Sequence, residues 1–427
     1  MAISKVIIIG GGASGLAAAV SAAKQGAEVT ILEHKDRVGK KILMTGNGKC
    51  NLTNVSDYHG KYYSSDEKSL KKIYNTFERF GANETIEFFE EIGLYTKEKR
   101  DGGVYPMSEQ ASCVLDVLRS ECEYRKVKIL TECETINIEP QKKGVKVSFV
   151  QYIYQDKVVN SKGKKKVREL IKEDKKNLVS DKVILATGGK AAAVSGSDGT
   201  GYKLAKALGH SIITPLPALV QLKCEGDYFK SVSGVRVQAD LELYINNKSA
   251  AKECGELQLT DYGISGIPVF QFSRIASRAM FEKKSCKVKI NFIPDMKKLP
   301  DSDKLGYKGV EEFLSGFVNK KLANLICRKH GILPNQTLKQ IGLEKTKRCV
   351  NELQSFWVTV TDTNSFDNAQ VCSGGVPLSE VSDNFESLKC PNVYLTGELL
   401  DCDAICGGYN LQWAWSTGII AGRAVCE

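Results

Sequence analysis

The sequence lacks the patterns that mark a metal site, a redox dithiol or a membrane span. Its 14 cysteines include no Cys-x-x-Cys pair, and the two nearest, Cys402 and Cys406, are separated by three residues, which does not fit zinc-ligand spacing either. The four histidines form no His-Glu-x-x-His motif or similar cluster. No apolar run is long enough to cross a bilayer. We therefore expect neither a bound metal nor a membrane-embedded protein.

Cysteine content and charge bear on the compartment and the partners. A chain of 427 residues with 14 cysteines and no recognisable signal peptide is typical of a reducing environment, so we expect a cytoplasmic protein. The formal charge of +10 could indicate an anionic partner. However, the densest basic run, Lys162 to Lys176, contains Glu169, Glu173 and Asp174 and no aromatic ladder. We expect this run to be a solvated loop, and we do not expect nucleic acid as a partner.

The chain has one glycine fingerprint of the type G-x-G-x-x-G, at Gly10 to Gly15. It follows the apolar run Lys5 to Gly10 and precedes an alanine-rich segment, Leu16 to Gln25. A second apolar run, Ala27 to Glu33, ends in an acid. A strand, a glycine turn, a helix and a second strand in this order are the setting in which the dinucleotide-binding fingerprint is found.

Each residue type in the fingerprint has a physical role. Gly10 allows the tight turn, Gly12 leaves room for a pyrophosphate, and Gly15 lets the helix pack closely on the strand. The helix N-terminus offers N–H groups and a positive dipole end to the pyrophosphate. Glu33 lies where a carboxylate can accept both hydroxyls of an adenosine ribose. The motif predicts a dinucleotide site; the alternative is a turn that only packs a helix on a sheet.

A segment rich in glycine and lysine, Gly39 to Asn54, follows shortly after Glu33, the acid predicted to bind the ribose. Gly39, Gly46 and Gly48 would allow this segment to lie flat against a ligand. Its lysines could pair with a phosphate, whereas the alternative is a plain exposed loop.

Two later segments are expected to return to the first sheet. Lys182 to Gly189 is a buried strand that ends in Ala-Thr-Gly-Gly, which would place Thr187 and Gly188 close to the cofactor. Asn392 to Glu398 is an apolar strand that ends in Gly-Glu, and a glycine turn and a helix follow it as far as Gly418. This arrangement is typical of FAD proteins, in which the acid takes a ribityl hydroxyl and the helix N-terminus faces the flavin pyrimidine edge.

The remaining segments indicate the domain organisation. Between residues 211 and 363, short alternating strands predict a β-barrel or sandwich, with helices at 313–329 and 338–352. The predicted fold class is α/β: a Rossmann-like FAD-binding domain of the glutathione-reductase type with an inserted β-barrel and a small helical subdomain. The expected boundaries are 1–205 and 366–427 for the discontinuous FAD-binding domain, 206–298 and 352–365 for the barrel, and 299–351 for the helical subdomain.

Further elements are expected in the first half of the FAD-binding domain. Helices are predicted at 70–93 (one or two) and at 110–124, and residues 127–136 are predicted to be another strand of the first sheet. An antiparallel meander is expected from 145–150, 152–159 and 175–179, joined by the basic loop.

Several segments together resemble a bacterial family of NAD(P)/FAD-dependent oxidoreductases. They are Gly39 to Asn54, Ala186 to Gly189, Gly263 to Gly266, Ala369 to Glu380 and Gly397 to Gly418. The family is described as aminoacetone-oxidase-like and includes a flavoprotein reductase of the bile-acid dehydroxylation pathway. The resemblance runs the whole length of the chain and implies FAD as the cofactor and the three-part fold given above. The chain departs from the family at Asp261, where many relatives carry histidine, and at Lys49, where arginine is usual.

The resemblance also implies particular FAD contacts. They lie at Ser14, Glu33, Lys41, the Thr45–Gly48 loop (which would face the flavin ring), Thr135 through its main chain, Glu398, Asn410 and Leu411. With the glycine motifs, the expected cofactor-binding residues are Gly10, Gly12, Ala13, Ser14, Gly15, Glu33, Lys41, Thr45, Gly46, Asn47, Gly48, Thr135, Thr187, Gly188, Gly397, Glu398, Asn410 and Leu411.

The expected chemistry is hydride transfer at flavin N5, to or from a small organic or steroid-like substrate, with NADH or NADPH as a transient reductant. Two alternatives stay open: an amine oxidase of the aminoacetone type that releases hydrogen peroxide, and a flavin-bearing regulatory or RNA-associated protein that is not an enzyme. Tyr262, Tyr409, Lys49 and Asp261 are candidate proton donors by type and neighbourhood only, so no catalytic residue is assigned. The chain could be a monomer or a homodimer.

Overall fold

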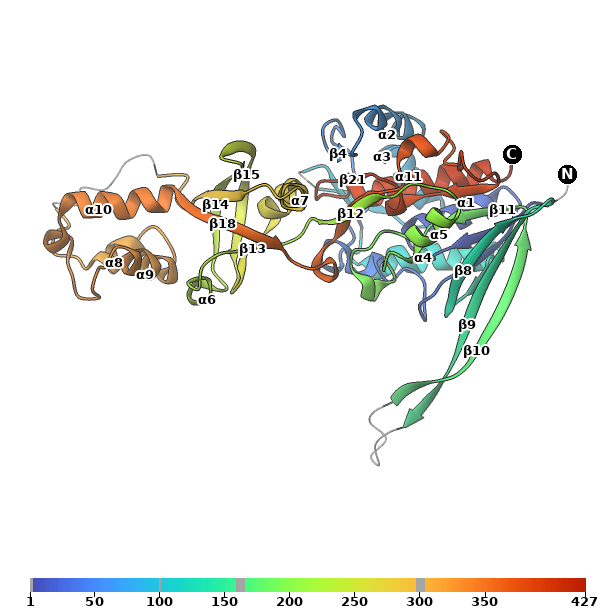
Figure 1. Cartoon of the computed structure of the whole chain (residues 1–427), viewed down its shortest axis with the longest axis horizontal. Helices are drawn as coiled ribbons and strands as arrows, with labels where there is room; N and C mark the ends of the chain where they lie inside the picture. Colours follow the sequence, from blue (N-terminus) through green and yellow to red (C-terminus); the bar gives the residue numbers. More distant parts are fainter. Residues whose placement is uncertain (1–2, 100, 159–165, 297–303) are drawn as a thin grey trace. The chain divides into compact units, whose positions relative to one another are not determined.

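The computed structural model describes residues 3–99, 101–158, 166–296 and 304–427 (Figure 1). The chain divides into two compact units. Unit 1 comprises Met1–Pro215 and Val371–Glu427, and unit 2, which is inserted between these segments, comprises Leu216–Gln370. Each unit has its own buried apolar core.

A parallel sheet of five strands forms the centre of unit 1, as predicted for a Rossmann-like domain. Its order is β20-β11-β1-β2-β7, and every neighbouring pair is parallel. The strands are β1 (Lys5–Ile9), β2 (Glu28–Leu32), β7 (Lys128–Leu130), β11 (Lys182–Leu185) and β20 (Val393–Leu395). Val6 to Ile9 are each at most 4% exposed, as β-branched residues are in a strand covered on both faces.

Two helices from opposite ends of the chain pack together in this unit. They are α1 (Ala13–Lys24) and α11 (Tyr409–Ala424). A Cβ at Gly418 would lie 2.3 Å from the Ser14 carbonyl oxygen, and one at Gly422 would lie 2.5 Å from that of Ala18. Only glycine allows the two backbones to approach this closely. The other helices of unit 1 are α2 (Glu67–Arg79), α3 (Ala82–Glu91), α4 (Ala111–Tyr124) and α5 (Thr200–Ala207).

A second, antiparallel sheet corrects several predictions. Its order is β10-β9-β8, with β8 at Cys133–Pro140, β9 at Val145–Val158 and β10 at Lys166–Ser180. The separate strands expected at 145–150 and 152–159 are one continuous strand, β9, whose described part ends at Val158. The single strand expected at 127–136 is instead split into β7 and β8, because the chain turns at Glu132, whose φ is +58°.

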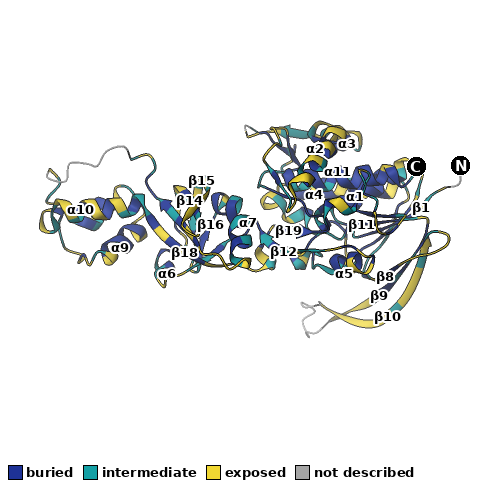
Figure 2. Cartoon of the chain, turned by 45° about the horizontal axis from the view of Figure 1, so that its top comes forward, coloured by how far each residue is buried: buried dark blue, intermediate teal, exposed yellow. Residues whose placement is uncertain are grey.

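The basic run is a further correction. From Lys166 it belongs to β10 and pairs with β9, because apolar residues such as Val167, Leu170 and Ile171 and a long ladder, interrupted by one β-bulge, outweigh the charge. Residues 162–165 lie outside the described residues. The run is solvated as expected, since Figure 2 colours the outer parts of both strands as exposed.

Short strands complete unit 1. One sheet contains β3 (Thr53–Asn54), β6 (Gly103–Pro106) and β5 (Thr96–Glu98), and a second contains β4 (Tyr62–Tyr63) and β21 (Asp403–Ala404). A third pairs β19 (Val371–Gly375) with β12 (Ile213–Ala218), whose last residues already belong to unit 2.

Unit 2 contains the predicted barrel. The closed order is β13 (Leu222–Cys224), β16 (Gly263–Ser265), β15 (Lys248–Leu259), β14 (Arg236–Ile245), β17 (Cys286–Asn291) and β18 (Phe356–Thr363). The helices are α6 (Phe229–Val232), α7 (Ile267–Phe281), α8 (Val310–Ser315), α9 (Lys320–Lys329) and α10 (Leu338–Gln354). The single helix expected at 313–329 is wrong: it is broken between α8 and α9, where the Asn319 side chain accepts a hydrogen bond from the Lys321 N–H at 2.9 Å and starts a new helix. Among the described helices, none combines the length and the apolarity that a bilayer crossing requires.

Candidate cofactor site

In the turn between β1 and α1, two glycines of the fingerprint are closely packed and one borders open space. A Cβ at Gly15 would lie 1.9 Å from the Gly10 carbonyl oxygen, and one at Gly10, whose φ is +101°, would lie 2.5 Å from the Ala186 carbonyl oxygen. A Cβ at Gly12 would meet no atom within 4 Å. Gly10 and Gly15 are therefore required by packing, whereas Gly12 borders open space at the N-terminus of α1, where an anion can approach the backbone.

The Glu33 carboxylate lies at the carboxyl end of β2 and is held in a fixed orientation. One oxygen accepts the Gly11 N–H and the other accepts the Lys35 N–H, each at 2.8 Å. The residue is buried, so these bonds compensate part of the cost of removing the charge from water. The remaining lone pairs can accept hydroxyl groups, as the predicted ribose contact requires.

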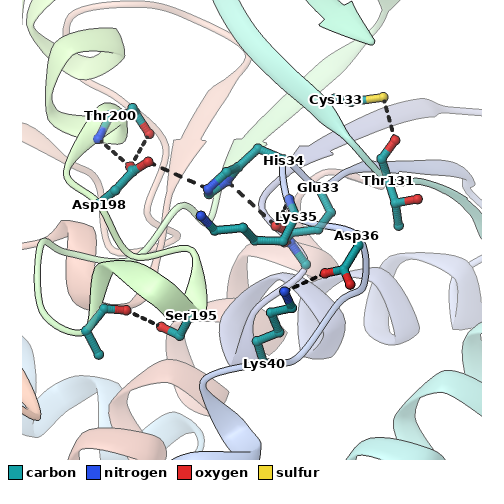
Figure 3. A network of polar contacts seen from close by, with 12 residues as sticks. Glu33, His34, Lys35, Asp36, Lys40, Thr131, Cys133, Ser195, Asp198 and Thr200 are labelled. Atoms are coloured by element: carbon teal, nitrogen blue, oxygen red, sulfur yellow. Dashed lines mark hydrogen bonds and ion pairs between the residues drawn. The ribbon is translucent and has the colours of Figure 1, made fainter. Parts of the chain in front are cut away.

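A polar network extends from Glu33 to the loop before α5 (Figure 3). The His34 ring lies 3.6 Å from a Glu33 oxygen through Nδ1 and 3.6 Å from an Asp198 oxygen through Nε2. Asp198 accepts the Thr200 N–H at 3.0 Å and its hydroxyl at 2.7 Å. Burial raises the pKa of Asp198, but these hydrogen bonds and the nearby His34 and Lys35 hold it below its usual value. The network connects the loop before α5 to the carboxyl end of β2, beside Glu33.

A second polar cluster joins residues from both ends of unit 1. Lys41 Nζ lies 2.7 Å from one Glu398 oxygen, and the other Glu398 oxygen accepts the Cys372 N–H at 2.8 Å. Lys41 Nζ also reaches the Ser197 hydroxyl at 3.5 Å. The adjacent Gly397 packs against Ser14, where a Cβ would lie 2.7 Å from the hydroxyl. The fold thus brings Lys41, Glu398 and the fingerprint into one neighbourhood.

The predicted flat loop has an unusual backbone. Gly46 and Asn47 both have φ of 54° and Gly48 has φ of 81°, and all three are exposed. Thr45 closes the loop, because its hydroxyl donates to the Ile42 carbonyl at 2.6 Å. The loop presents its main chain rather than bulky side chains, although its contact with a flavin ring stays a prediction.

At the start of α11, the side chain of Asn410 is bound within the chain. It accepts the Ala404 N–H and donates to the Ala404 carbonyl, both at 2.9 Å. Gly408, with φ of 97°, packs so closely on β3 that a Cβ would lie 2.7 Å from the Thr53 carbonyl oxygen. The side chain of Asn410 is therefore engaged in the loop, and a cofactor would be met by the main-chain N–H groups of Asn410 and Leu411 in the first helical turn.

Buried polar atoms without a hydrogen-bond partner test whether a dinucleotide fits. In the described part of unit 1 they include Thr135 Oγ1, Thr187 Oγ1 and the Tyr202 hydroxyl. A Cβ at Gly189 would lie 3.0 Å from a Glu398 oxygen and 3.1 Å from the Tyr202 hydroxyl, so Glu398 and Tyr202 border the same small space beside Gly189. Buried polar groups are normally satisfied, and the hydroxyls and phosphates of FAD would provide partners. No sequence motif indicated Tyr202; burial raises its pKa well above the usual range.

The candidate proton donors are placed in different surroundings. Lys49 lies 3.2 Å from Glu109, which also binds two other lysines; hydrogen bonds from Lys97, Lys49 and Lys99 lower the pKa of Glu109 to about 2. Tyr409 is buried, and burial raises its pKa. Asp261 and Tyr262 belong to unit 2, where the Tyr262 hydroxyl accepts the Asn364 amide at 3.3 Å.

Two other groups bear on reactivity. Burial raises the pKa of Cys50 to about 11, which leaves its thiol protonated and unreactive. Throughout the described residues, no group of three or more His, Cys, Asp or Glu side chains is arranged to hold a metal ion.

The parallel sheet and the inserted barrel together define a protein of the Rossmann-like class. A family model described as the HI0933-like protein Rossmann domain matches residues 4–424. The chain belongs to this HI0933-like family, and the predicted family resemblance is confirmed by a curated relative of matching description. That relative, a 3-dehydro-bile acid delta(4,6)-reductase of Clostridium scindens, is 42% identical over 434 residues and is covered over 99% of both chains.

Two further similarities widen the comparison. A ribosomal RNA dihydrouridine synthase of Haemophilus influenzae is 29% identical, over 99% of this chain and 98% of its own. Among solved structures, a 3-ketosteroid-delta4-(5alpha)-dehydrogenase from Rhodococcus jostii RHA1 in complex with 4-androstene-3,17-dione has a TM-score of 0.51 and 14% identity, with 99% of this chain and 97% of that chain covered. The structural likeness concerns the fold alone.

Proposed function

We propose that this chain is an FAD-dependent oxidoreductase that reduces a carbon–carbon double bond conjugated to a ketone in a steroid-like substrate. The observation that carries the cofactor assignment is the fixed Glu33 carboxylate beside a fingerprint whose Gly12 borders open space. The substrate class rests on the relative named as a bile-acid reductase, which matches this chain over its whole length.

Different residues of the site would contact different parts of FAD. Glu33 accepts the ribose hydroxyls, and Gly12 with the first N–H groups of α1 receives the pyrophosphate. Lys41 adds a positive charge, and Glu398, held by Lys41 and by the Cys372 N–H, presents a carboxylate oxygen to a ribityl hydroxyl. The positive end of α11, at Asn410 and Leu411, would face the pyrimidine edge of the flavin.

When bound, FAD supplies two-electron transfer at its isoalloxazine ring. The protein provides binding, orientation and electrostatics, and NADH or NADPH would act as the transient reductant. Among the candidate proton donors Lys49 is paired with Glu109, and no residue is assigned as the proton donor to the substrate.

A second candidate function is reduction of uracil bases in RNA. The relative named as a ribosomal RNA dihydrouridine synthase spans 99% of this chain, and the reducible double bond of uracil is likewise conjugated to a carbonyl. Both candidates therefore use one type of chemistry and differ in the molecule recognised. The amine-oxidase alternative differs in the direction of hydride transfer, because the flavin would oxidise the substrate and the reaction would release hydrogen peroxide.

One set of assays separates these functions. The purified protein is examined by visible spectroscopy without oxygen, before and after NADH or NADPH, and then with a 3-oxo-Δ4 or 3-oxo-Δ4,6 bile acid. We expect a flavin spectrum that bleaches with a nicotinamide cofactor and recovers as the bile acid gains two hydrogen atoms by mass spectrometry. Recovery with uridine-containing ribosomal RNA instead would favour the second candidate, peroxide release with amines would favour the oxidase, and absence of flavin after reconstitution would reject all three.

A further inference from the structure

The outer half of the β9–β10 hairpin is a two-stranded ribbon with apolar side chains in solvent. We use "the ribbon" for residues 152–157 of β9 and 167–176 of β10. Ile153, Tyr154, Val167, Leu170 and Ile171 are between 38% and 58% exposed. Two-stranded ribbons are marginally stable alone, and a group of exposed apolar residues marks an interaction surface.

One edge of the ribbon is available for pairing. Among the described strands, β10 pairs only with β9, so its outer edge carries backbone groups that no strand satisfies. Residues 168–173 on this edge read Arg-Glu-Leu-Ile-Lys-Glu. Reading these six residues backward gives the opposite charge at every charged position, and the two apolar residues stay at the centre.

We propose that β10 pairs antiparallel with β10 of a second copy of this chain, about a two-fold axis between Leu170 and Ile171. In this register Arg168 meets Glu173 of the second copy, and Glu169 meets its Lys172. Leu170 meets Ile171 across the axis. Within residues 168–173 each charge faces an opposite charge, and a four-stranded sheet replaces two exposed ribbons.

The β-bulge in β10 makes this register possible. In a regular strand, residues five apart point to opposite faces, so Arg168 and Glu173 could not meet across an axis perpendicular to the sheet. The ladder shifts between Leu170 and Lys172, so that Arg168 lies opposite Asp156 and Glu173 lies opposite Tyr152. Positions 152 and 156 share a face, and therefore so do Arg168 and Glu173.

The second ion pair forms on the other face by the same reasoning. Glu169 lies opposite Gln155, and Lys172 lies opposite Ile153, which share a face of β9. Contacts within the chain agree with this division of faces. The Arg168 guanidinium lies 4.5 Å from the centre of the Tyr154 ring on one face, and Glu169 lies 3.1 Å from Lys157 on the other.

Charge favours a second copy over a polyanion as the occupant. Residues 167–176 contain four basic and three acidic side chains, a nearly balanced mixture rather than a continuous positive surface of the kind that binds nucleic acid. The register is also specific: a slip of one position opposes Glu169 to Glu173 in one direction and Arg168 to Lys172 in the other. The present Glu169–Lys157 ion pair is exposed on both sides, so exchanging it costs little.

Charge exchange tests the proposal on the purified full chain by sedimentation velocity over a wide concentration range. Glu169→Lys and Lys172→Glu each place like charges at two symmetric positions, so we expect each to weaken the dimer roughly tenfold or more. The double variant, with both charges exchanged, should dimerise like the wild type. A mixture of the two single variants should form a heterodimer. Lys142→Glu, in the exposed turn between β8 and β9, carries the same charge change as Lys172→Glu and should leave the dimer intact.

Several results would overturn the proposal. They are a wild-type chain that stays monomeric at every concentration, a dimer that neither charge reversal weakens, and a monomer whose ribbon instead binds RNA in a salt-dependent way. Far-ultraviolet circular dichroism and thermal unfolding of each variant verify that a lost dimer does not reflect a misfolded chain.

Discussion

Replacing Gly12 with valine separates the two kinds of glycine in the fingerprint. Gly12 is the N-cap of α1 with φ of −81° and ψ of −165°, and a Cβ there meets no atom within 4 Å. Removing a glycine stabilises a chain by about 0.4–1 kcal/mol through the unfolded state. Loss of a favourable N-cap residue costs a similar amount, about 1 kcal/mol. The free energy of unfolding of FAD-free Gly12→Val should therefore lie within about 1 kcal/mol of the wild-type value.

FAD binding should respond very differently to the same change. The valine side chain would occupy the space from which a pyrophosphate reaches the N–H groups of α1. A hydrogen bond to a charged group contributes about 1.5–3 kcal/mol, so losing two of them lowers the affinity roughly 100- to 10,000-fold. Urea unfolding measures the stability of the FAD-free protein, and quenching of flavin fluorescence measures the affinity.

Gly309→Val provides a matched control for this experiment. Gly309 is the N-cap of α8 in unit 2, with φ of −61°, and a Cβ there also meets no atom within 4 Å. This variant should bind FAD like the wild type. Wild-type affinity in Gly12→Val would refute the position given to the pyrophosphate. Unfolding of the FAD-free Gly12→Val protein would refute the separation of binding from packing.

Three further predictions address the site and its surroundings. Glu33→Gln should weaken FAD binding roughly tenfold or more by calorimetric titration, because an amide replaces a charged acceptor, whereas Glu28→Gln, an exposed acid on the same strand, should not. Gly15→Ala should destabilise the FAD-free protein by about 3 kcal/mol or more in urea, since its Cβ would lie 1.9 Å from a carbonyl oxygen; a change close to zero would contradict the described turn. Glu109 has its pKa lowered from 4.5 to about 2, so its stabilising effect is present above about pH 4.5 and is lost as the pH falls towards 2. Glu109→Gln should flatten that part of the pH–stability curve, and an unchanged slope would count against the lysine cluster.

Local signals explain what could be predicted from the sequence. The β1–α1–β2 unit could be predicted because the spacing of its glycines between two apolar runs is specific to that turn. The barrel could be predicted because apolar and polar residues alternate along its strands. The start of α7 also carried a readable signal, because Gly266 is its N-cap and Pro268 lies in its first turn, but the surrounding short strands obscured it.

Long-range effects explain what could not be predicted. The positive φ of Glu132, which splits β7 from β8, is rare for a residue with a Cβ and has no sequence marker. The strand character of β10 comes from its ladder with β9 rather than from its own charged residues. The engagement of the Asn410 side chain by Ala404 depends on a loop geometry that spacing alone does not give.

A hydrolase-like arrangement in unit 1 shows why geometry must be weighed against access. His210 lies 2.8 Å from Glu380 through Nδ1 and 2.7 Å from the Ser387 hydroxyl through Nε2, which is the order of a serine triad. The imidazole is fully buried, and the Ser387 oxygen already accepts the Lys389 and Cys390 N–H groups at 3.0 and 2.9 Å. The hydroxyl has no lone pair to offer a substrate, so the trio joins the end of α5 to the 380–390 segment as a structural link.

The cofactor site differs from that link because it includes exposed backbone and buried hydroxyls that no other described group of the chain satisfies. Gly12 borders an opening, and the buried hydroxyls of Thr187 and Tyr202 lack partners. The groups around them come from both segments of unit 1, as the Lys41–Glu398 pair illustrates. A ligand that satisfies these groups binds the folded chain and not the unfolded one, and so adds its binding free energy to the stability of the unit. The two segments of unit 1 are already joined by the β11–β20 pairing and by the packing of α1 on α11, and a ligand bound to both segments would stabilise that union further.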